Sequence, residues 1–203
     1  GQLSLAKFLF ITAEDGVKLD TRDEKHFLSY ILERIDLTRD IHFHTNTTID
    51  TLDYSGDGLN TGSKVVIAAY GKKLRSLITT VPEVLKQSAL VRDAAMVMPG
   101  VVAVNMNKFV DYETAQQEMQ RLSDEILAKT NQAGIHELPM MVVCDDASFT
   151  AATMKNFLWV TFTRSNPSHD IYGVDSFTKF KHWGCKSTMI IDARIKPFHA
   201  PPL

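Results

Sequence analysis

His42 and His44 are the first pair of side chains in this sequence whose type and spacing could support chemistry. They lie in Ile41–Asn46, where alternating apolar and polar residues predict a strand. Because side chains alternate across a strand, both imidazoles would project from one face. A metal site needs a third and usually a fourth ligand, and none follows at a recognisable spacing. The pattern favours two polar residues on a solvated strand face over a metal site.

A glycine-rich loop from Gly56 to Lys64 contains the ingredients of an anion-binding turn. Glycines let the backbone approach an anion, and the lysine supplies a positive charge. The order Gly62-Ser63-Lys64 departs from the Walker phosphate motif, and a strand, Val65–Tyr70, follows where that motif has a helix. Taken alone, the loop is equally compatible with a tight turn and with an anion contact.

Asp145 and Asp146 end an apolar run, at a place where α/β proteins often carry functional groups. Adjacent side chains on an extended chain point in opposite directions. A shared acid–base role is therefore disfavoured, and loop solvation with helix capping is the preferred interpretation.

Arg34 and Arg164 each follow the apolar face of a predicted helix. An arginine near a helix C-terminus interacts favourably with the helix dipole and can bind a neighbouring carboxylate, here Asp40 or Asp170. The repeated pattern favours a structural role over a catalytic one.

Net charge, apolar runs and cysteine content indicate which partners and which location to expect for this protein. The 203 residues carry a net charge of -2, so a nucleic acid partner is not expected. No apolar run is long enough to predict a membrane span. The two cysteines, Cys144 and Cys185, form no disulfide framework and indicate a reducing cytoplasm. Cys185 lies among lysines and histidines and could be somewhat reactive, although a core or turn position is favoured.

The elements that must position these side chains alternate between strands and helices. Apolar runs predict strands at 5–12, 41–46, 65–70, 101–105 and 140–143. One-sided apolar patterns and end signals predict four helices: after a capping box at Thr21–Glu24, from Pro82 to about Val91, from the cap Asp111 to Ala133 with Gly134 ending it, and across Met154, Phe157, Leu158 and Phe162.

The two ends of the chain repeat one another. The motif Arg34–Ile41 recurs as Arg164–Ile171 at a constant offset, with arginine, aspartate and isoleucine at matching places. Further on, Gly62–Lys64 aligns with Gly184–Lys186, and a strand follows each. This recurrence predicts an internal duplication.

We therefore predict an α/β fold in α/β/α layers, with two pseudo-symmetric strand–helix–strand units around mixed sheets. The units would span residues 1–74 and 138–203. Residues 75–137 would form a connecting segment with a long helix.

Several stretches together resemble the UbiD family of reversible decarboxylases. In the first unit they are AKFLFITAEDG, ERIDLTRDI, NTTIDTLDY and GSKVVI; in the second they are MMVVCDD, TFTRSNPSHDI and GCKSTMIIDARIK. They follow the order and spacing of that family's C-terminal domain, and the last resembles its glycine-x-lysine, strand, Asp-Ala-x-x-Lys ending. The segment from about 75 to 137 carries no such resemblance.

This resemblance implies the C-terminal part of a carboxy-lyase for aromatic or α,β-unsaturated acids, of which one class acts on 3-octaprenyl-4-hydroxybenzoate in ubiquinone biosynthesis. Family members use prenylated FMN with a divalent metal and potassium. Their catalytic Glu-Arg-Glu set lies in a middle domain and is absent here. We expect no catalytic or metal-binding residue and no cofactor bound to this fragment. It would close over the cofactor beside its own N-terminal and middle domains and pair subunits as a dimer or higher oligomer.

Gly62, Ser63 and Lys64 are the cofactor-binding residues that the resemblance implies, because Lys64 matches a family lysine near the flavin phosphate. Lys186 stands at the equivalent place of the repeat, and the sequence does not decide between the two lysines. An alternative is a non-catalytic oligomerisation or binding module, in which exposed side chains such as Trp159 pair copies of the chain. A weaker alternative is a nucleotide-binding protein that uses the loop at Gly56.

Overall fold

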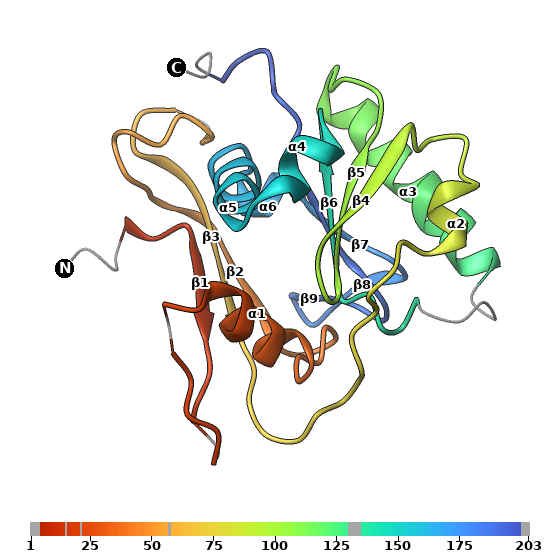
Figure 1. The fold of residues 1–203 in the computed structure, drawn as a ribbon. Coiled ribbons are helices and arrows are strands. Elements are labelled where there is room, and N and C mark those ends of the chain that lie inside the picture. The colour runs from red at the N-terminus through yellow and green to blue at the C-terminus, as the bar shows by residue number, and fades with distance from the viewer. Residues whose placement is uncertain (1–4, 15, 21, 57, 130–134, 200–203) are drawn as a thin grey trace.

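The structure is a computed structural model that describes residues 5–14, 16–20, 22–56, 58–129 and 135–199. Strands and helices follow one another along the chain (Figure 1), in the order β1 (Phe8–Ile11), α1 (Glu24–Leu32), β2 (Ile41–Thr48), β3 (Thr61–Ala68), α2 (Glu83–Lys86), β4 (Asp93–Met98), β5 (Val101–Asn105), α3 (Tyr112–Ala128), β6 (Met140–Cys144), α4 (Ala147–Ala152), α5 (Met154–Thr163), α6 (Pro167–Asp170), β7 (Ile171–Gly173), β8 (Ser176–Lys179), β9 (His182–Cys185) and β10 (Met189–Asp192).

Two mixed sheets and one hairpin form the framework. The three-stranded sheet has the order β1-β3-β2, in which β1 and β3 are parallel and β2 is antiparallel. The five-stranded sheet has the order β4-β5-β6-β10-β7, with a parallel centre and antiparallel edge strands. Strands β8 and β9 pair only with each other among the described strands. The predicted α/β fold with mixed sheets is confirmed.

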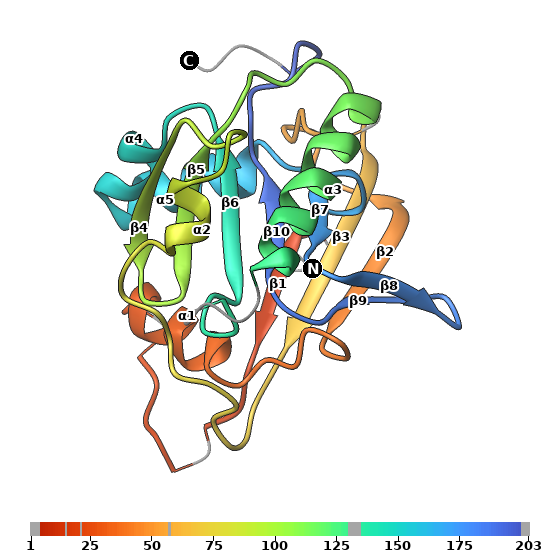
Figure 2. The same ribbon diagram turned by 90° about the vertical axis from the view of Figure 1, so that its right-hand side faces the viewer.

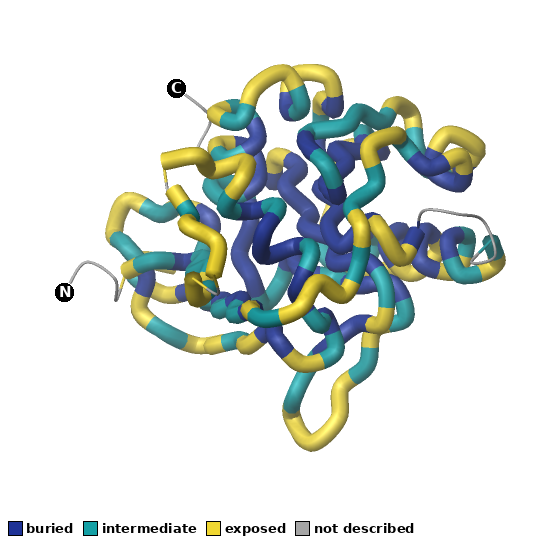
Figure 3. The backbone as a smooth tube through the Cα atoms, turned by 60° about the horizontal axis from the view of Figure 1, so that its bottom comes forward, coloured by how far each residue is buried: buried dark blue, intermediate teal, exposed yellow. Residues whose placement is uncertain are grey.

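Helices cover the five-stranded sheet on both faces. Helices α2 and α3 pack on one face, where Leu85 and Leu122 are fully buried. Helices α1 and α5 lie between the two sheets (Figure 1), with Ile31 and Phe157 in the core that both sheets share. Buried residues concentrate in the middle of the molecule, and exposed residues occupy its outer loops (Figure 3). Burying each such side chain contributes about 1.5–3 kcal/mol to folding.

The segment 75–137 supplies more than the expected long helix. Its strands β4 and β5 join the five-stranded sheet beside β6, which lies in the expected second unit. The expected boundaries at 74 and 138 stay a prediction. Within the described residues, no helix combines the length and the apolar character needed to cross a membrane.

The two predicted units share one topology and one register. The order β1-β3-β2 recurs as β6-β10-β7, with the same parallel and antiparallel pairings. Ile67 pairs with both Phe10 and Ile41, and its counterpart Ile191 pairs with both Val142 and Ile171. The internal duplication that would explain this recurrence stays a prediction.

One part of the predicted alignment is wrong. Val65 and Met189 hold equivalent register positions, so Thr188 is the counterpart of Lys64. Lys186 lies two residues earlier, in the turn after β9. The β8–β9 hairpin lies between β7 and β10 and includes Gly184 and Cys185, and the described residues of the first unit contain no equivalent pair of strands.

Capping side chains mark the starts of α1 and α3, and some of these helix ends differ from those that the sequence patterns predicted. Asp111 caps α3 as predicted, and it accepts from the Thr114 amide. Helix α3 ends at Ala128 rather than at 133, and the predicted end at 134 lies outside the described residues. At α1 the cap is Asp23, which accepts from the His26 amide. The predicted cap, Thr21, also lies outside the described residues.

Pattern reading missed the elements with the shortest sequence signals. Helix α2 ends at Lys86 rather than near 91, and the edge strand β4 follows it. The hairpin β8–β9 was also not predicted. Its turn residues Phe180 and Lys181 have φ angles of 51° and 67°, in the left-handed region that hairpin turns normally fill with asparagine and glycine.

This turn predicts a stabilising variant. Left-handed backbone costs an L-residue about 1–2 kcal/mol, so Phe180→Asn with Lys181→Gly should raise the free energy of unfolding by about 1 kcal/mol. Thermal unfolding would show it as a Tm increase of about 3 °C.

Lys179→Gly is the control, because Lys179 lies in β8 and glycine weakens a strand. An unchanged or lower Tm for the double variant would show that the turn stores no strain.

Candidate functional site

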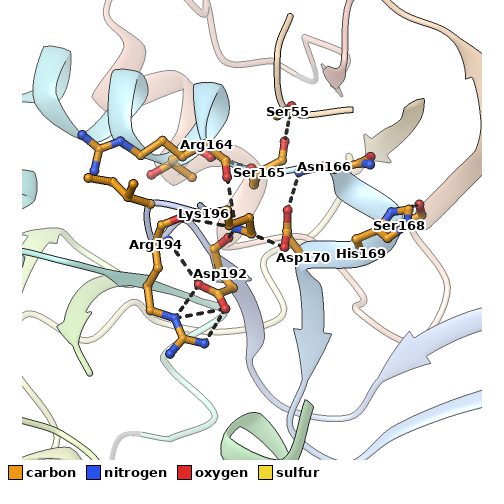
Figure 4. Close-up of polar contacts among 12 residues, drawn as sticks. Ser55, Arg164, Ser165, Asn166, Ser168, His169, Asp170, Asp192, Arg194 and Lys196 are labelled. Atoms are coloured by element: carbon orange, nitrogen blue, oxygen red, sulfur yellow. Dashed lines mark hydrogen bonds and ion pairs between the residues drawn. The ribbon is translucent and has the colours of Figure 1, made fainter. Parts of the chain in front are cut away.

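Buried charges gather after β10, at the carboxyl ends of the parallel strands β5, β6 and β10. The motif Asp192-Ala-Arg194-Ile-Lys196 supplies three charged side chains with 0% exposure. Figure 4 shows that the Arg194 side chain points toward the Asp192 carboxylate and that Lys196 points toward Asp170 from α6. We call Asp170, Asp192, Arg194 and Lys196 the ionic cluster.

Arg194 is held by a fork of short hydrogen bonds. Its Nε donates to Asp192 Oδ1 at 2.9 Å, and its Nη2 donates to Oδ2 at 2.6 Å. Its Nη1 donates to Glu118 Oε2 at 2.6 Å and to the Asn107 carbonyl at 2.8 Å, which ties β10 to α3. Burial lowers the pKa of Arg194, but the hydrogen bonds and charges of Asp192 and Glu118 outweigh burial and raise it above its ordinary value.

Lys196 and Asp170 form the second pair of the ionic cluster. Lys196 Nζ lies 3.2 Å from Asp170 Oδ1 and donates to the carbonyls of Asp192 at 2.9 Å and Arg164 at 3.1 Å. Asp170 Oδ2 accepts from the Asn166 amide at 2.6 Å. Burial raises the pKa of Asp170 to about 7, although Lys196 and the amide both favour the carboxylate.

A polar seam joins this cluster to the three-stranded sheet. Ser63 Oγ, on β3, donates to the Asn166 side chain and accepts from the Ser168 amide at 2.8 Å. Ser55 Oγ donates to the Ser165 carbonyl at 3.3 Å. Lys7 donates to Ser55 at 2.5 Å and pairs with Asp53 at 2.9 Å. Residues from both predicted units thus meet at the start of α6.

His199 is a buried histidine beside the seam. It is 9% exposed, and neither ring nitrogen has a hydrogen-bond partner among the described residues. Its ring packs against Tyr54 and Phe198. Burial, together with the positive charges of Lys196 and Lys7, lowers the pKa of His199 to about 4.

The three predicted cofactor residues lie within β3 rather than in a loop. Gly62 is buried against Ile49, where a side chain would collide, and the Ser63 hydroxyl is engaged in the seam. Lys64 is half-buried and lies opposite His44 in the strand ladder. Lys186 is 64% exposed and pairs with Asp175 at 3.0 Å.

The glycine loop has a packing reason for its composition. Gly56 lies against Thr61 and the Ile49 side chain, so an added Cβ would collide with them. This close approach accounts for a tight turn.

The histidine pair stays apart from any metal-type cluster. His42 and His44 are exposed, and the His42 ring lies 5.8 Å from that of His182. No group of three or more histidine, cysteine, aspartate or glutamate side chains in the described part of the chain could hold a metal ion.

Asp146 caps α4 as predicted, and it accepts from the Phe149 amide. The companion Asp145 accepts from the Ile195 amide at 2.8 Å, in the chain that follows β10. The predicted helix capping is confirmed for Asp146, whereas Asp145 binds the chain after β10 rather than lying in a solvated loop without such a contact.

The predicted partners of the two arginines are wrong. Arg34 donates to the carbonyls of Tyr30 and Gly71 and pairs with Glu33, while Arg164 lies 3.5 Å from Asp145. The first aspartate of the motif pairs instead with adjacent Arg39, and the second pairs with Lys196, because the chain after β10 brings a lysine that the local sequence does not contain.

Neither cysteine is placed to be reactive. Both are buried, and burial raises the pKa of Cys144 to about 11 and that of Cys185 to about 12. The reactivity considered for Cys185 is therefore not supported. Cys185 is the last residue of β9, and its thiol packs against Gly173 rather than lying in an open basic loop.

Comparison with known proteins identifies the family. Residues 1–69 match the family model described as the 3-octaprenyl-4-hydroxybenzoate carboxy-lyase C-terminal domain, UbiD_C.

Residues 1–69 carry a UbiD C-terminal domain.

A protein of Chlamydia trachomatis serovar D is 32% identical over 97% of this chain, and so is a Chlamydia pneumoniae protein that is named as a subunit of 4-hydroxybenzoate decarboxylase. The chain spans 31% of the length of each.

Solved structures of UbiD-class enzymes show a weaker likeness. HmfF from Pelotomaculum thermopropionicum, in complex with prFMN, matches with a TM-score of 0.39 and 14% identity, over 78% of this chain and 39% of that one. Vanillic acid decarboxylase of Sedimentibacter hydroxybenzoicus matches with a TM-score of 0.38 and 15% identity, over 79% and 40%.

Sequence reasoning noted the Asp192–Lys196 ending of the UbiD pattern but assigned it no role. The signal that could have found it was three charges directly after a fully apolar strand, a place where charge is costly unless it is paired. Each charge of the ionic cluster is paired with an opposite charge, although Asp170 Oδ1 accepts no hydrogen bond among the described residues besides its 3.2 Å approach to Lys196. These contacts support a positional role, in which the cluster links β10, α3 and α6.

The two shifted residues of this region predict opposite pH dependences. Between pH 4 and 7 folded Asp170 binds a proton that the unfolded chain releases, so its contribution to stability falls as pH rises. Between pH 4 and 6.5 folded His199 excludes a proton that the unfolded chain binds, so its contribution rises. Each contribution is on the order of 3–4 kcal/mol.

Single variants should separate the two slopes. In urea unfolding from pH 4 to 8, Asp170→Asn should leave stability that rises with pH, and His199→Gln should leave stability that falls. Identical pH profiles for Asp170→Asn and the unmodified chain would refute the raised pKa of Asp170.

Proposed function

We propose that this chain is the C-terminal part of a UbiD-type carboxy-lyase that carries out non-oxidative decarboxylation of an aromatic or α,β-unsaturated acid. The match of residues 1–69 to the carboxy-lyase C-terminal domain carries this proposal. The relative named as a 4-hydroxybenzoate decarboxylase subunit, of which this chain spans 31%, supports it. The chain is inactive alone, since the catalytic carboxylates belong to another domain of the full protein.

The full-length protein would use prenylated FMN with a divalent metal and potassium. When bound, prenylated FMN supplies an electron sink at the carbon that loses carbon dioxide. Of the nominated residues, Gly62 and Ser63 are committed to internal packing, so they would act by fixing β3 rather than by touching a phosphate. Lys64, half-buried on the same strand, is the group whose charge suits a flavin phosphate.

The domain itself would close over the cofactor and pair subunits. Its N-terminal and middle domains are the proposed partners, within a cytoplasmic dimer or higher oligomer. Ubiquinone biosynthesis is the proposed pathway, because the resemblance in sequence implies it for the class that acts on 3-octaprenyl-4-hydroxybenzoate, the acid named in the family description. The ionic cluster and the polar seam would give the closing body one fixed shape, because Arg194 links the stretch after β10 to α3 and Lys196 links it to α6.

Two lysine variants test the cofactor role in the full-length protein. Lys64→Ala should lower the bound flavin fraction and the decarboxylation rate, because a phosphate would lose its charge partner. Lys186→Ala is the matched control, since that exposed lysine pairs with Asp175 on the hairpin. Flavin absorbance per protein and carbon dioxide release give the two readouts. Normal flavin content in Lys64→Ala would remove Lys64 from the site, and a loss only in Lys186→Ala would reassign the role.

An assembly role is the second candidate, and an exposed aromatic pair favours it. Phe149 on α4 and Trp159 on α5 are 46% and 39% exposed, with ring centroids 6.3 Å apart. Aromatic residues of this kind are enriched at protein interfaces.

Sedimentation velocity tests this assembly role. The chain should sediment as a dimer or larger species, and Phe149→Ser with Trp159→Ser should shift it to the monomer, whereas Leu52→Ser, at a residue 87% exposed elsewhere, should not. A monomer at every concentration would exclude pairing by this surface.

A further inference from the structure

A cavity of about 470 Å³ lies between β2 and the β8–β9 hairpin. Figure 2 shows the hairpin beside β2, the edge strand of the three-stranded sheet. The hairpin is fastened at both ends. At its root the Cys185 amide donates to the Leu37 carbonyl, and beside its turn His182 Nε2 bonds the Thr38 carbonyl at 2.9 Å. The cavity therefore has one wall from the sheet and one from the hairpin.

The lining combines aromatic rings with basic groups. Phe43 and Trp183 face each other edge to face at 5.5 Å, and the His42 and His182 rings lie 5.8 Å apart. Lys181 lies at the rim. Buried isoleucines from β2 and β7 close the interior, and no carboxylate of the described residues lines the cavity. Such a surface disfavours a cation and suits a planar ring that carries a negative charge.

The strained turn belongs to this cavity. Phe180 and Lys181, both in the left-handed region, are both lining residues, and Phe180 is 92% exposed. Backbone strain of this kind clusters at ligand clamps and functional loops. A turn chosen only for stability would carry asparagine and glycine, so the residues present keep an aromatic ring and a charge at the mouth instead.

We propose that this cavity binds a small aromatic carboxylate, with its ring against Phe43 and Trp183 and its carboxylate toward Lys181. The inference rests on the lining alone and is independent of the decarboxylase proposal. No covalent step is involved: the site binds and releases the anion.

Nuclear magnetic resonance titration of the full 203-residue chain tests the site, with benzoate as the probe. Amide signals of residues 41–45 and 180–183 should shift and saturate, with a Kd on the order of 1 mM for so small a ligand. Benzamide, which lacks the charge, and cyclohexanecarboxylate, which lacks the aromatic ring, should each bind at least threefold more weakly.

Two neighbouring lysines provide the matched pair of variants. Lys181→Ala should weaken benzoate about threefold to tenfold, because the rim loses its permanent charge. Lys179→Ala, on the same hairpin but outside the cavity lining, should leave the Kd unchanged. Thr45→Asp places a carboxylate in the lining and should abolish binding. The Phe180→Asn and Lys181→Gly double variant should raise Tm while weakening benzoate.

Several results would overturn the site. They are shifts that do not saturate, equal affinity for benzamide and benzoate, and equal losses in the two lysine variants. If the same signals broaden as the protein concentration rises and do not respond to benzoate, the cavity is instead a contact between protein copies. Because the titration uses neither flavin nor decarboxylation, its failure would leave the proposed function untouched, and failure of that function would not affect the titration.

Discussion

The buried pairing of Asp192 with Arg194 is the interaction on which the rest of the structure depends. Removing either charge from water costs several kcal/mol, and the pair is tolerable only because its remaining hydrogen-bonding groups are engaged. Arg194 reaches Glu118 of α3 and a backbone carbonyl as well, while the neighbouring Lys196 turns the other way to Asp170. One short stretch after β10 thereby fixes a sheet, a long helix and the turn at α6. Loss of one partner would leave the other buried and unpaired, so the elements must assemble together.

The polar seam extends this constraint to the three-stranded sheet. The Ser63 side chain projects from β3 and donates a hydrogen bond to the Asn166 side chain. The backbone amide of Asn166 in turn donates to Asp170. A residue nominated for a cofactor thus acts first as a joint between the two predicted units. This contact holds β3, and with it Lys64, in one position relative to α6.

Equivalent positions of the two predicted units differ in environment rather than in backbone. Asp40 accepts from the amide of Asp36 in the same turn that Asp170 makes with Asn166. The first carboxylate then pairs with a 72% exposed arginine, whereas the second lies in the interior opposite Lys196. Burial raises the pKa of Asp170 as a consequence. One local motif therefore serves as a surface turn in one unit and as part of a buried cluster in the other.

The sequence by itself determined the features that depend on neighbours along the chain. Apolar patterns located the core strands and the faces of α1 and α5, Asp111 and Asp146 marked helix starts, and ordered motifs indicated the UbiD family. Contacts between distant segments were decided only by the tertiary structure. Lys196 meets Asp170, Ser63 meets Asn166 and the hairpin meets β2 because strand order, which local periodicity does not encode, brings them together. The motif match also misaligned Lys186, since it follows the motif letters, whereas the strand ladder places Lys186 two residues before the position equivalent to Lys64.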